Sequence, residues 1–153
     1  MEIKKILENT SNFVTKRLIE LFGALILILS IFLIISLLSY SGNDQPLIFE
    51  DNPVVENILG QKGSFISDLF FQSIGLISLL SAITFFITGI NIFRTKKLIL
   101  ILKNPFYLIL YVILGSLFFA VYYPESFLLN IYGNGGFVGK QISETFLVSL
   151  INL

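Results

Sequence analysis

The strongest constraint on this chain is a run without charged residues from Leu21 to Asn43, whose centre, Leu25 to Leu38, is nearly all Ile, Leu and Phe. A helix rises ~1.5 Å per residue, so the run is long enough to cross the ~30 Å hydrocarbon layer of a bilayer. It exceeds the ~7–15 apolar residues of a signal-peptide core, and no small-residue cleavage site follows it. We therefore expect a retained membrane span.

Two further uncharged runs follow, Leu69 to Phe93 and Pro105 to Tyr123. Asn104 is the expected N-cap of the third helix and Pro105 its first residue. The tail from Gly133 to Leu153 is interrupted by charges and leaves too few residues for a further crossing. The sequence predicts an all-α integral membrane protein with three complete transmembrane helices, about 18–40, 69–93 and 105–123, and an outward helical segment leading to a missing fourth span.

Composition excludes several classes of protein. The chain is 55% hydrophobic and 13% charged, which is too apolar for a small soluble domain. It has no Cys and no His, which excludes thiol nucleophiles, disulfides, thiolate or imidazole zinc sites and a Ser-His-Asp triad. Its formal net charge of zero does not indicate a nucleic-acid surface.

The distribution of Lys and Arg predicts the orientation, because basic residues beside a span resist translocation. The N-terminal segment and the second loop hold Lys4, Lys5, Lys16, Arg17, Arg94, Lys96, Lys97 and Lys103, whereas the other two segments hold Lys62 and Lys140. We expect the N-terminus 1–17 and the loop 94–104 to be cytoplasmic. The outer loop 41–68 and the outer segment 124–153 should face outward.

The outer loop is acidic, and Asp44, Glu50, Asp51 and Glu56 could in principle bind a divalent cation. The EF-hand spacing is missing, so a solvated acidic loop is favoured and no metal site is predicted. Within the loop, a short helix is expected that Asn52 caps, Pro53 opens and Gly60 closes.

Small residues should set the helix contacts, since they let helices approach closely in lipid. The second span carries Gly75, Ser78, Ala82 and Gly89 on one face, and the third span carries Gly115, Ser116 and Ala120. Leu79 of the second span is expected to face lipid. Packing within the chain is favoured over self-association through the same face. Residues 98–102 either lie in the cytoplasmic interface or begin the third helix.

The glycine-rich run from Gly133 to Gln141 imitates a phosphate-binding loop because it contains Gly139-Lys140 before a possible helix. A phosphate loop needs a glycine where Asn134 stands and a hydroxyl where Gln141 stands. We expect a tight turn leading into a helix and no nucleotide site.

Ordered residues around the three spans resemble the N-terminal membrane domain of the FtsK/SpoIIIE bacterial DNA translocases over residues 18–153. They are Ser39, Tyr40 and Asp44 after the first span, Asn57, Gly60, Gly63 and Asp68 before the second, Gly75 within it, and Gly135, Gly136 and Gly139 after the third. The sequence departs from the family where Gln45 separates Asp44 from Pro46, and a proline common within the second span is missing.

The resemblance implies a four-span anchor in the bacterial inner membrane, at the division septum. A linker would join it to a cytoplasmic ATPase that moves double-stranded DNA, and its partners would be division-machinery proteins. ATP and Mg²⁺ would bind that motor, so this chain is expected to have no catalytic residues, no cofactor and no DNA contact. The alternative is a free-standing small three-span membrane protein, such as an accessory subunit of a transporter or membrane complex.

Overall fold

The fold is given by a computed structural model that describes residues 2–44, 55–97, 99–125, 129 and 131–151. In these residues the secondary structure is entirely helical: α1 Glu2–Leu38, α2 Gly60–Ile74, α3 Ile77–Thr95, α4 Ile99–Tyr122 and α5 Gly136–Ile151. Three segments of the described chain are long and apolar enough to cross a membrane, Thr10–Leu38, Ile77–Thr95 and Lys103–Tyr122. The predicted all-α membrane fold with three spans is confirmed.

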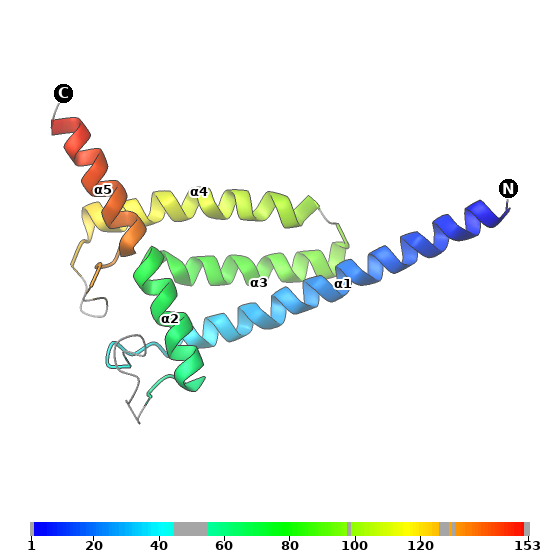
Figure 1. The fold of residues 1–153 in the computed structure, drawn as a ribbon, viewed down its shortest axis with the longest axis horizontal. Helices are drawn as coiled ribbons and strands as arrows, with labels where there is room; N and C mark the ends of the chain where they lie inside the picture. The colour runs from blue at the N-terminus through cyan, green and yellow to red at the C-terminus, as the bar shows by residue number, and fades with distance from the viewer. Residues whose placement is uncertain (1, 45–54, 98, 126–128, 130, 152–153) are drawn as a thin grey trace.

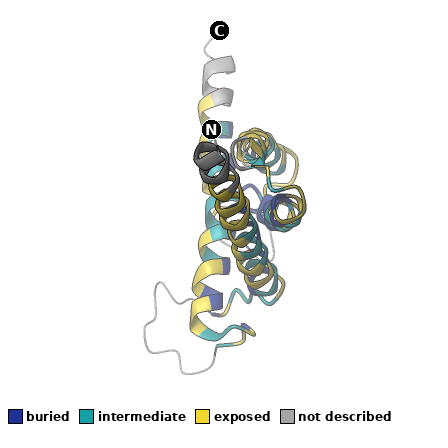
Figure 2. Ribbon diagram, turned by 90° about the vertical axis from the view of Figure 1, so that its right-hand side faces the viewer, coloured by how far each residue is buried: buried dark blue, intermediate teal, exposed yellow. Residues whose placement is uncertain are grey.

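The helices form two layers (Figure 1). In the first, here the span layer, α3 lies between α1 and α4 and contacts both. The second, here the cap layer, consists of α2 and α5, which contact each other and cross the ends of the span helices far from the N-terminus. Figure 2 looks along the span layer and shows α2 and α5 extended across it.

Helix α1 is longer than a bilayer requires. Its 37 residues would extend ~55 Å at ~1.5 Å per residue, so the N-terminal part projects past α3 and α4 (Figure 1). Where α1 leaves the bundle, the Glu20 carboxylate accepts a hydrogen bond from Arg17 at 2.7 Å and lies 3.2 Å from Lys96 Nζ. This ion-pair group ties α1 to the end of α3. From Glu2 onward, the expected N-terminal segment continues the first span as one helix.

The expected second span, 69–93, is wrong as a single helix. Helix α2 ends at Ile74, Gly75 adopts φ 70° and ψ −151°, and α3 begins at Ile77. The uncharged run is thus divided between the cap layer and the span layer. The outer loop 41–68 is correspondingly shorter than expected, because α2 already begins at Gly60. Gly60 opens this helix instead of closing an earlier one, while Asn52 and Pro53 lie outside the described residues.

The predicted start of the third helix is also wrong. Helix α4 begins at Ile99, and Pro105 lies inside it. Asn104 does not cap the helix, because its Nδ2 donates to Thr88 Oγ1 on α3 at 2.9 Å. Lys96 ends α3 in the left-handed conformation at φ 55°, which turns the chain directly into α4. Of the two interpretations of the apolar segment before Lys103, the structure supports the beginning of α4.

The small residues of α3 pack within the chain. Gly89 faces α1 so closely that a Cβ there would lie 2.8 Å from the backbone nitrogen of Leu27. Ser78 and Ala82 are also buried, nearer the start of α3. Leu79 was expected to face lipid, but it is half-buried and packs against the core that includes Ala82, whereas Leu80 is exposed.

One close contact was not singled out from the sequence. A Cβ on Gly23 of α1 would lie 2.6 Å from the backbone nitrogen of Phe93 on α3. Gly23 and Gly89 therefore allow α1 and α3 to approach closely at two levels of the membrane. A single glycine in an apolar run gives no periodic signal, which explains why it was missed.

Candidate functional site

Residues that carry the family resemblance gather at two places where the cap layer meets the span layer. The first, here the polar cluster, lies between the end of α1 and α2 and consists of Ser36, Ser39, Tyr40, Asp44, Asn57, Gly63, Ser64, Ser67 and Asp68. The second, here the glycine junction, lies between the starts of α3 and α5 and the end of α4, and consists of Gly75, Ser116, Ala120, Asn134, Gly135, Gly136 and Gly139.

Asp44 joins the two ends of the outer loop. One carboxylate oxygen accepts the backbone N–H of Glu56 at 2.8 Å and the other accepts that of Asn57 at 2.9 Å. The backbone oxygen of Asp44 accepts the Ser64 hydroxyl at 3.1 Å, and Asp44 is only 4% exposed. Charge-assisted bonds to backbone N–H groups are among the stronger hydrogen bonds in proteins. The Asp44 carboxylate therefore joins the start of the loop to its end, and the Asp44 carbonyl joins it to α2.

Of the four acidic residues considered as cation ligands, Asp44 and Glu56 belong to the described part of the chain. Among the described residues no group of three or more His, Cys, Asp or Glu side chains is placed to hold a metal ion. Glu50 and Asp51 lie outside the described residues.

The side chain of Asn57, which follows the outer loop, hydrogen-bonds to backbone groups at the end of α1. Its Nδ2 donates to the carbonyl oxygens of Ser36 at 2.9 Å and Ser39 at 3.2 Å. Its Oδ1 accepts the N–H of Leu59 at 3.0 Å. The last carbonyls of a helix have no partner within the helix, and a buried carbonyl without a partner destabilises the fold. Asn57 thus caps α1 and starts the turn into α2.

Gly63 lets α2 lie directly on this cap. A Cβ at Gly63 would overlap Asn57 Oδ1 and sit 2.5 Å from the Leu59 Cβ. The Gly63 carbonyl accepts the hydroxyls of Ser36 at 2.5 Å and Ser67 at 3.0 Å. Glycine is therefore needed at position 63, because a side chain there would not fit between α2 and the Asn57 cap.

Tyr40 lies at the half-exposed edge of the polar cluster. Its hydroxyl donates to Asp68 Oδ1 at 3.4 Å, and its ring centroid lies 4.8 Å from that of Phe71. Burial raises the pKa of the Tyr40 phenol to about 12, and the negative charges of Asp68 and Asp44 act in the same direction. The phenol therefore stays protonated and serves as the donor. Ser39 Oγ completes this side by accepting the N–H of Ile58 at 3.2 Å.

At the glycine junction two chain reversals pack against each other. Gly75 has φ 70° and Gly136 has φ 63°, a region that favours glycine. A Cβ on either would overlap backbone, that of Asn134 for Gly75 and that of Gly75 itself for Gly136. The N–H of Leu76 donates to the Asn134 carbonyl at 2.9 Å. The break between α2 and α3 is thus made by residues that follow α4.

The rest of the glycine run packs on α4. A Cβ on Gly135 would lie 2.6 Å from the Ala120 Cβ, and one on Gly139 would overlap the Ser116 carbonyl. The Ser116 hydroxyl donates to the Ile74 carbonyl at 2.8 Å, which joins α4 to α2. The expected tight turn leading into a helix is confirmed, because α5 begins at Gly136.

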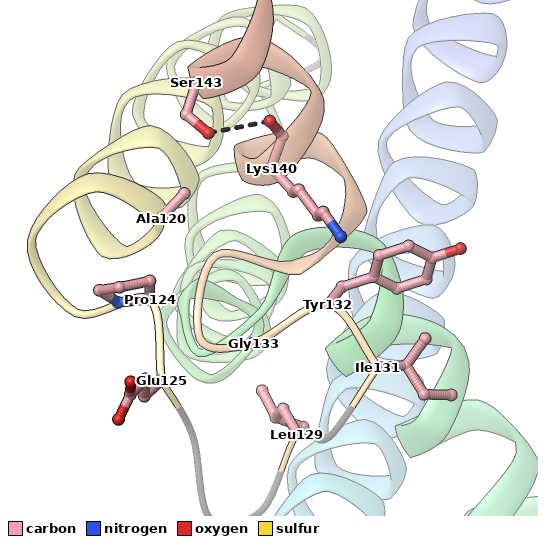
Figure 3. Close-up of a pocket in the computed structure, with 9 residues that line it drawn as sticks. All are labelled: Ala120, Pro124, Glu125, Leu129, Ile131, Tyr132, Gly133, Lys140 and Ser143. Atoms are coloured by element: carbon pink, nitrogen blue, oxygen red, sulfur yellow. Dashed lines mark hydrogen bonds between the residues drawn. The ribbon is translucent and has the colours of Figure 1, made fainter. Parts of the chain in front are cut away.

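A half-open cavity of about 510 Å³ lies beside the junction (Figure 3). Its lining consists of Ala120, Pro124, Glu125, Leu129, Ile131, Tyr132, Gly133, Lys140 and Ser143. Lys140 Nζ stands 5.9 Å from the centroid of the Tyr132 ring, and the Ser143 hydroxyl donates to the Lys140 carbonyl at 2.8 Å. In the described part of this lining, the Ser143 hydroxyl is thus directed to a backbone carbonyl and the Lys140 ammonium lies near the Tyr132 ring.

Taken together, the polar side chains at the cap end bind backbone groups and hold helices in place. Three apolar helices fastened at one end by such a layer define a multi-pass helical membrane domain. Residues 15–153 match the family described as the 4TM region of DNA translocase FtsK/SpoIIIE, and the chain belongs to this family. The resemblance seen in the sequence is thereby confirmed. No curated protein and no solved structure gives a significant match to the chain.

Proposed function

We propose that this chain is the membrane anchor of a bacterial DNA translocase that acts in cell division and chromosome segregation. In this role it tethers a cytoplasmic ATPase motor that these residues do not contain. The observation that carries the proposal is the family match across residues 15–153. The residues of the resemblance add support, because most of them are buried or half-buried and join helices at the cap end.

The arrangement of charge supports a cytoplasmic N-terminus in the inner membrane. The N-terminal part of α1 and the connection between α3 and α4 lie at the same end of the span layer (Figure 1). These two segments carry most of the basic residues, and such segments stay on the cytoplasmic side. The cap layer then faces outward, where division-machinery proteins at the septum could contact it, and α1 projects toward the motor.

The size of the native gene product tests the proposal directly. With a tag at the N-terminus of the chromosomal gene, we expect a band much larger than 17.2 kDa in inner-membrane fractions. A single stable band near 17 kDa would contradict the anchor role and favour a free-standing small membrane protein, such as an accessory subunit.

Enzymatic assays on the isolated chain provide a second test. We expect neither ATP hydrolysis above background nor binding of double-stranded DNA, because ATP and Mg²⁺ belong to the motor in this proposal. ATP hydrolysis that persisted after purification to homogeneity would place catalysis in the membrane domain. It would contradict the proposal that catalysis belongs to the motor alone.

Single cysteines test the orientation, since the native chain has none. Ile131 is 54% exposed at the cap end and Thr95 is exposed at the opposite end. In intact cells, an impermeant thiol reagent should label Ile131→Cys, and it should label Thr95→Cys only after the membrane is opened. The reverse pattern would invert the topology.

A further inference from the structure

Helix α2 has its polar face inside and its apolar face outside. The buried face carries Gly63, Ser64 and Ser67 of the polar cluster, together with Phe71. The exposed stripe consists of Gln61, Lys62, Phe65, Ile66 and Leu69. In a helix on the surface of a soluble domain the two faces would be exchanged. The exposed stripe of α2 therefore requires an apolar surrounding that the chain itself does not supply.

Both ends of α2 are fixed at the level where the spans leave the hydrocarbon. Near its start, the Gly63 carbonyl accepts the hydroxyl of Ser36, which lies in the last apolar turn of α1. At its other end, only Gly75 and Leu76 separate α2 from Ile77, the first residue of α3. Because α2 crosses the span layer between these two points, it lies at the boundary between acyl chains and headgroups.

The chemistry of the stripe suits this depth. Phe65, Ile66 and Leu69 are 42%, 40% and 47% exposed, and the stripe contains no acidic residue. Lys62 stands at its N-terminal end, where a long side chain can extend its ammonium toward phosphates while its stem remains in apolar contact. Helices that lie in the plane of the interface combine apolar and cationic side chains in this way.

We propose that α2 is an interfacial anchor. Its stripe of Phe65, Ile66 and Leu69 inserts into the leaflet nearer the cap layer, and Lys62 binds anionic lipid headgroups there. The lipid surface is chosen as occupant because both ends of the stripe are tied to membrane spans, so the stripe continues their lipid-facing surface. The proposal depends on the spans and is independent of the motor.

Tryptophan fluorescence can test the depth of α2, because the native chain has no Trp. Phe65→Trp would be reconstituted into liposomes whose lipids carry bromine either near the ester groups or near the chain ends. Phe32→Trp, on a half-exposed midspan position of α1, and Ile131→Trp, at the cap end, serve as the deep and aqueous controls. Each variant would first be checked for native helix content by circular dichroism.

For Phe65→Trp we expect most of the fluorescence to be lost to the shallow bromine and little to the deep one. Phe32→Trp should show the opposite preference, and Ile131→Trp should respond mainly to aqueous acrylamide. Leu69→Trp gives a second probe on the same stripe, and it should follow Phe65→Trp. Adding Lys62→Gln should weaken the shallow quenching in anionic liposomes and leave it unchanged in zwitterionic ones.

Two outcomes would overturn the proposal. Strong quenching of both stripe probes by acrylamide would place the stripe in water. Protection from bromine and acrylamide alike, growing with the ratio of protein to lipid, would show that a second copy of the chain covers α2 instead of lipid.

Discussion

The span layer and the cap layer hold their helices together in different ways. Between α1 and α3 the contact is made by small residues, with Gly23 and Gly89 each facing the backbone of the other helix. Where the cap layer meets the span layer, by contrast, buried polar groups such as Asp44 and Asn57 are hydrogen-bonded to backbone. Lipid removes the hydrophobic drive for helix association, which leaves close packing as the main contribution within the spans.

The cap layer faces a different problem, because it contains helix ends and chain reversals. Each helix end leaves backbone groups without partners, and these must be satisfied wherever water is excluded. Asn57 and Asn134 satisfy such groups from segments far along the chain. The comparison shows that Asp44, Asn57 and Asn134 complete the backbone at helix ends and turns on this side of the molecule.

The largest expected effect breaks the glycine junction. Gly75→Ala should destabilise the chain by about 2–6 kcal/mol or prevent folding, because its backbone conformation of φ 70° and ψ −151° costs a non-glycine residue ~1–3 kcal/mol and overpacking adds ~1–3 kcal/mol. The added Cβ would overlap the Asn134 backbone. Unfolding by SDS titration from a mild detergent measures the change.

Gly60→Ala is the matched control for that variant. Gly60 also has a positive φ, 66°, but a Cβ there meets nothing within 4 Å. It should therefore cost only the ~1–2 kcal/mol of the backbone conformation. If the two variants were equally destabilised, the packing of Gly75 on Asn134 would contribute nothing.

The next effect concerns the cap on α1. Asn57→Asp keeps the side-chain shape but removes the donor to the Ser36 and Ser39 carbonyls, and we expect a loss of about 2–3 kcal/mol. Asp68→Asn makes the opposite exchange in the same cluster. It should cost less than ~1 kcal/mol, since Tyr40 can still donate to the amide oxygen. If Asp68→Asn lost more stability than Asn57→Asp, the Asp68 carboxylate would contribute more to the cluster than the Asn57 amide does.

A third prediction concerns packing in the span layer. Ala82→Leu adds volume at a position that is 1% exposed and should cost about 1–3 kcal/mol through overpacking. Leu80→Phe adds volume at a neighbouring position that is 47% exposed, and it should change stability by less than ~0.5 kcal/mol. Equal tolerance at the two positions would mean that α3 does not present Ala82 to α1 and α2.

The smallest effects compare one tyrosine from each layer. Tyr111 donates to Thr84 Oγ1 at 2.7 Å within the spans, and Tyr111→Phe should cost about 0.6 kcal/mol. Tyr40→Phe removes a longer bond of 3.4 Å and should cost less than ~1 kcal/mol near neutral pH. Both losses would be read from the same SDS titration.

The two tyrosine variants should differ in alkali. The folded protein raises the pKa of Tyr40 from 10.0 to about 12, so its contribution is complete below pH 10 and is lost as the pH rises toward 12. The stability difference between the native chain and Tyr40→Phe should therefore shrink over that range. A difference that stayed constant would show that the Tyr40 phenol has the same pKa in the folded and unfolded states.

Much of this molecule could be predicted from the sequence because the relevant physics is local. Run length and the absence of charge fix the number of spans, since the transfer free energy of side chains into lipid adds along the chain. The face of Ser78, Ala82 and Gly89 follows from helical spacing, and packing within the chain was the favoured interpretation. The turn at Gly133–Gly136 was likewise visible from its glycines.

Other features were decided by the tertiary structure alone. The uncharged run through Gly75 reads as one span, because hydropathy does not register a helix break. The break exists because the Asn134 carbonyl accepts the Leu76 N–H and because Gly136 packs against Gly75. Asn104 likewise binds Thr88 instead of capping its own helix. Such partners lie far apart in sequence, and the need to satisfy buried backbone and side-chain polar groups selects them only when the helices have assembled.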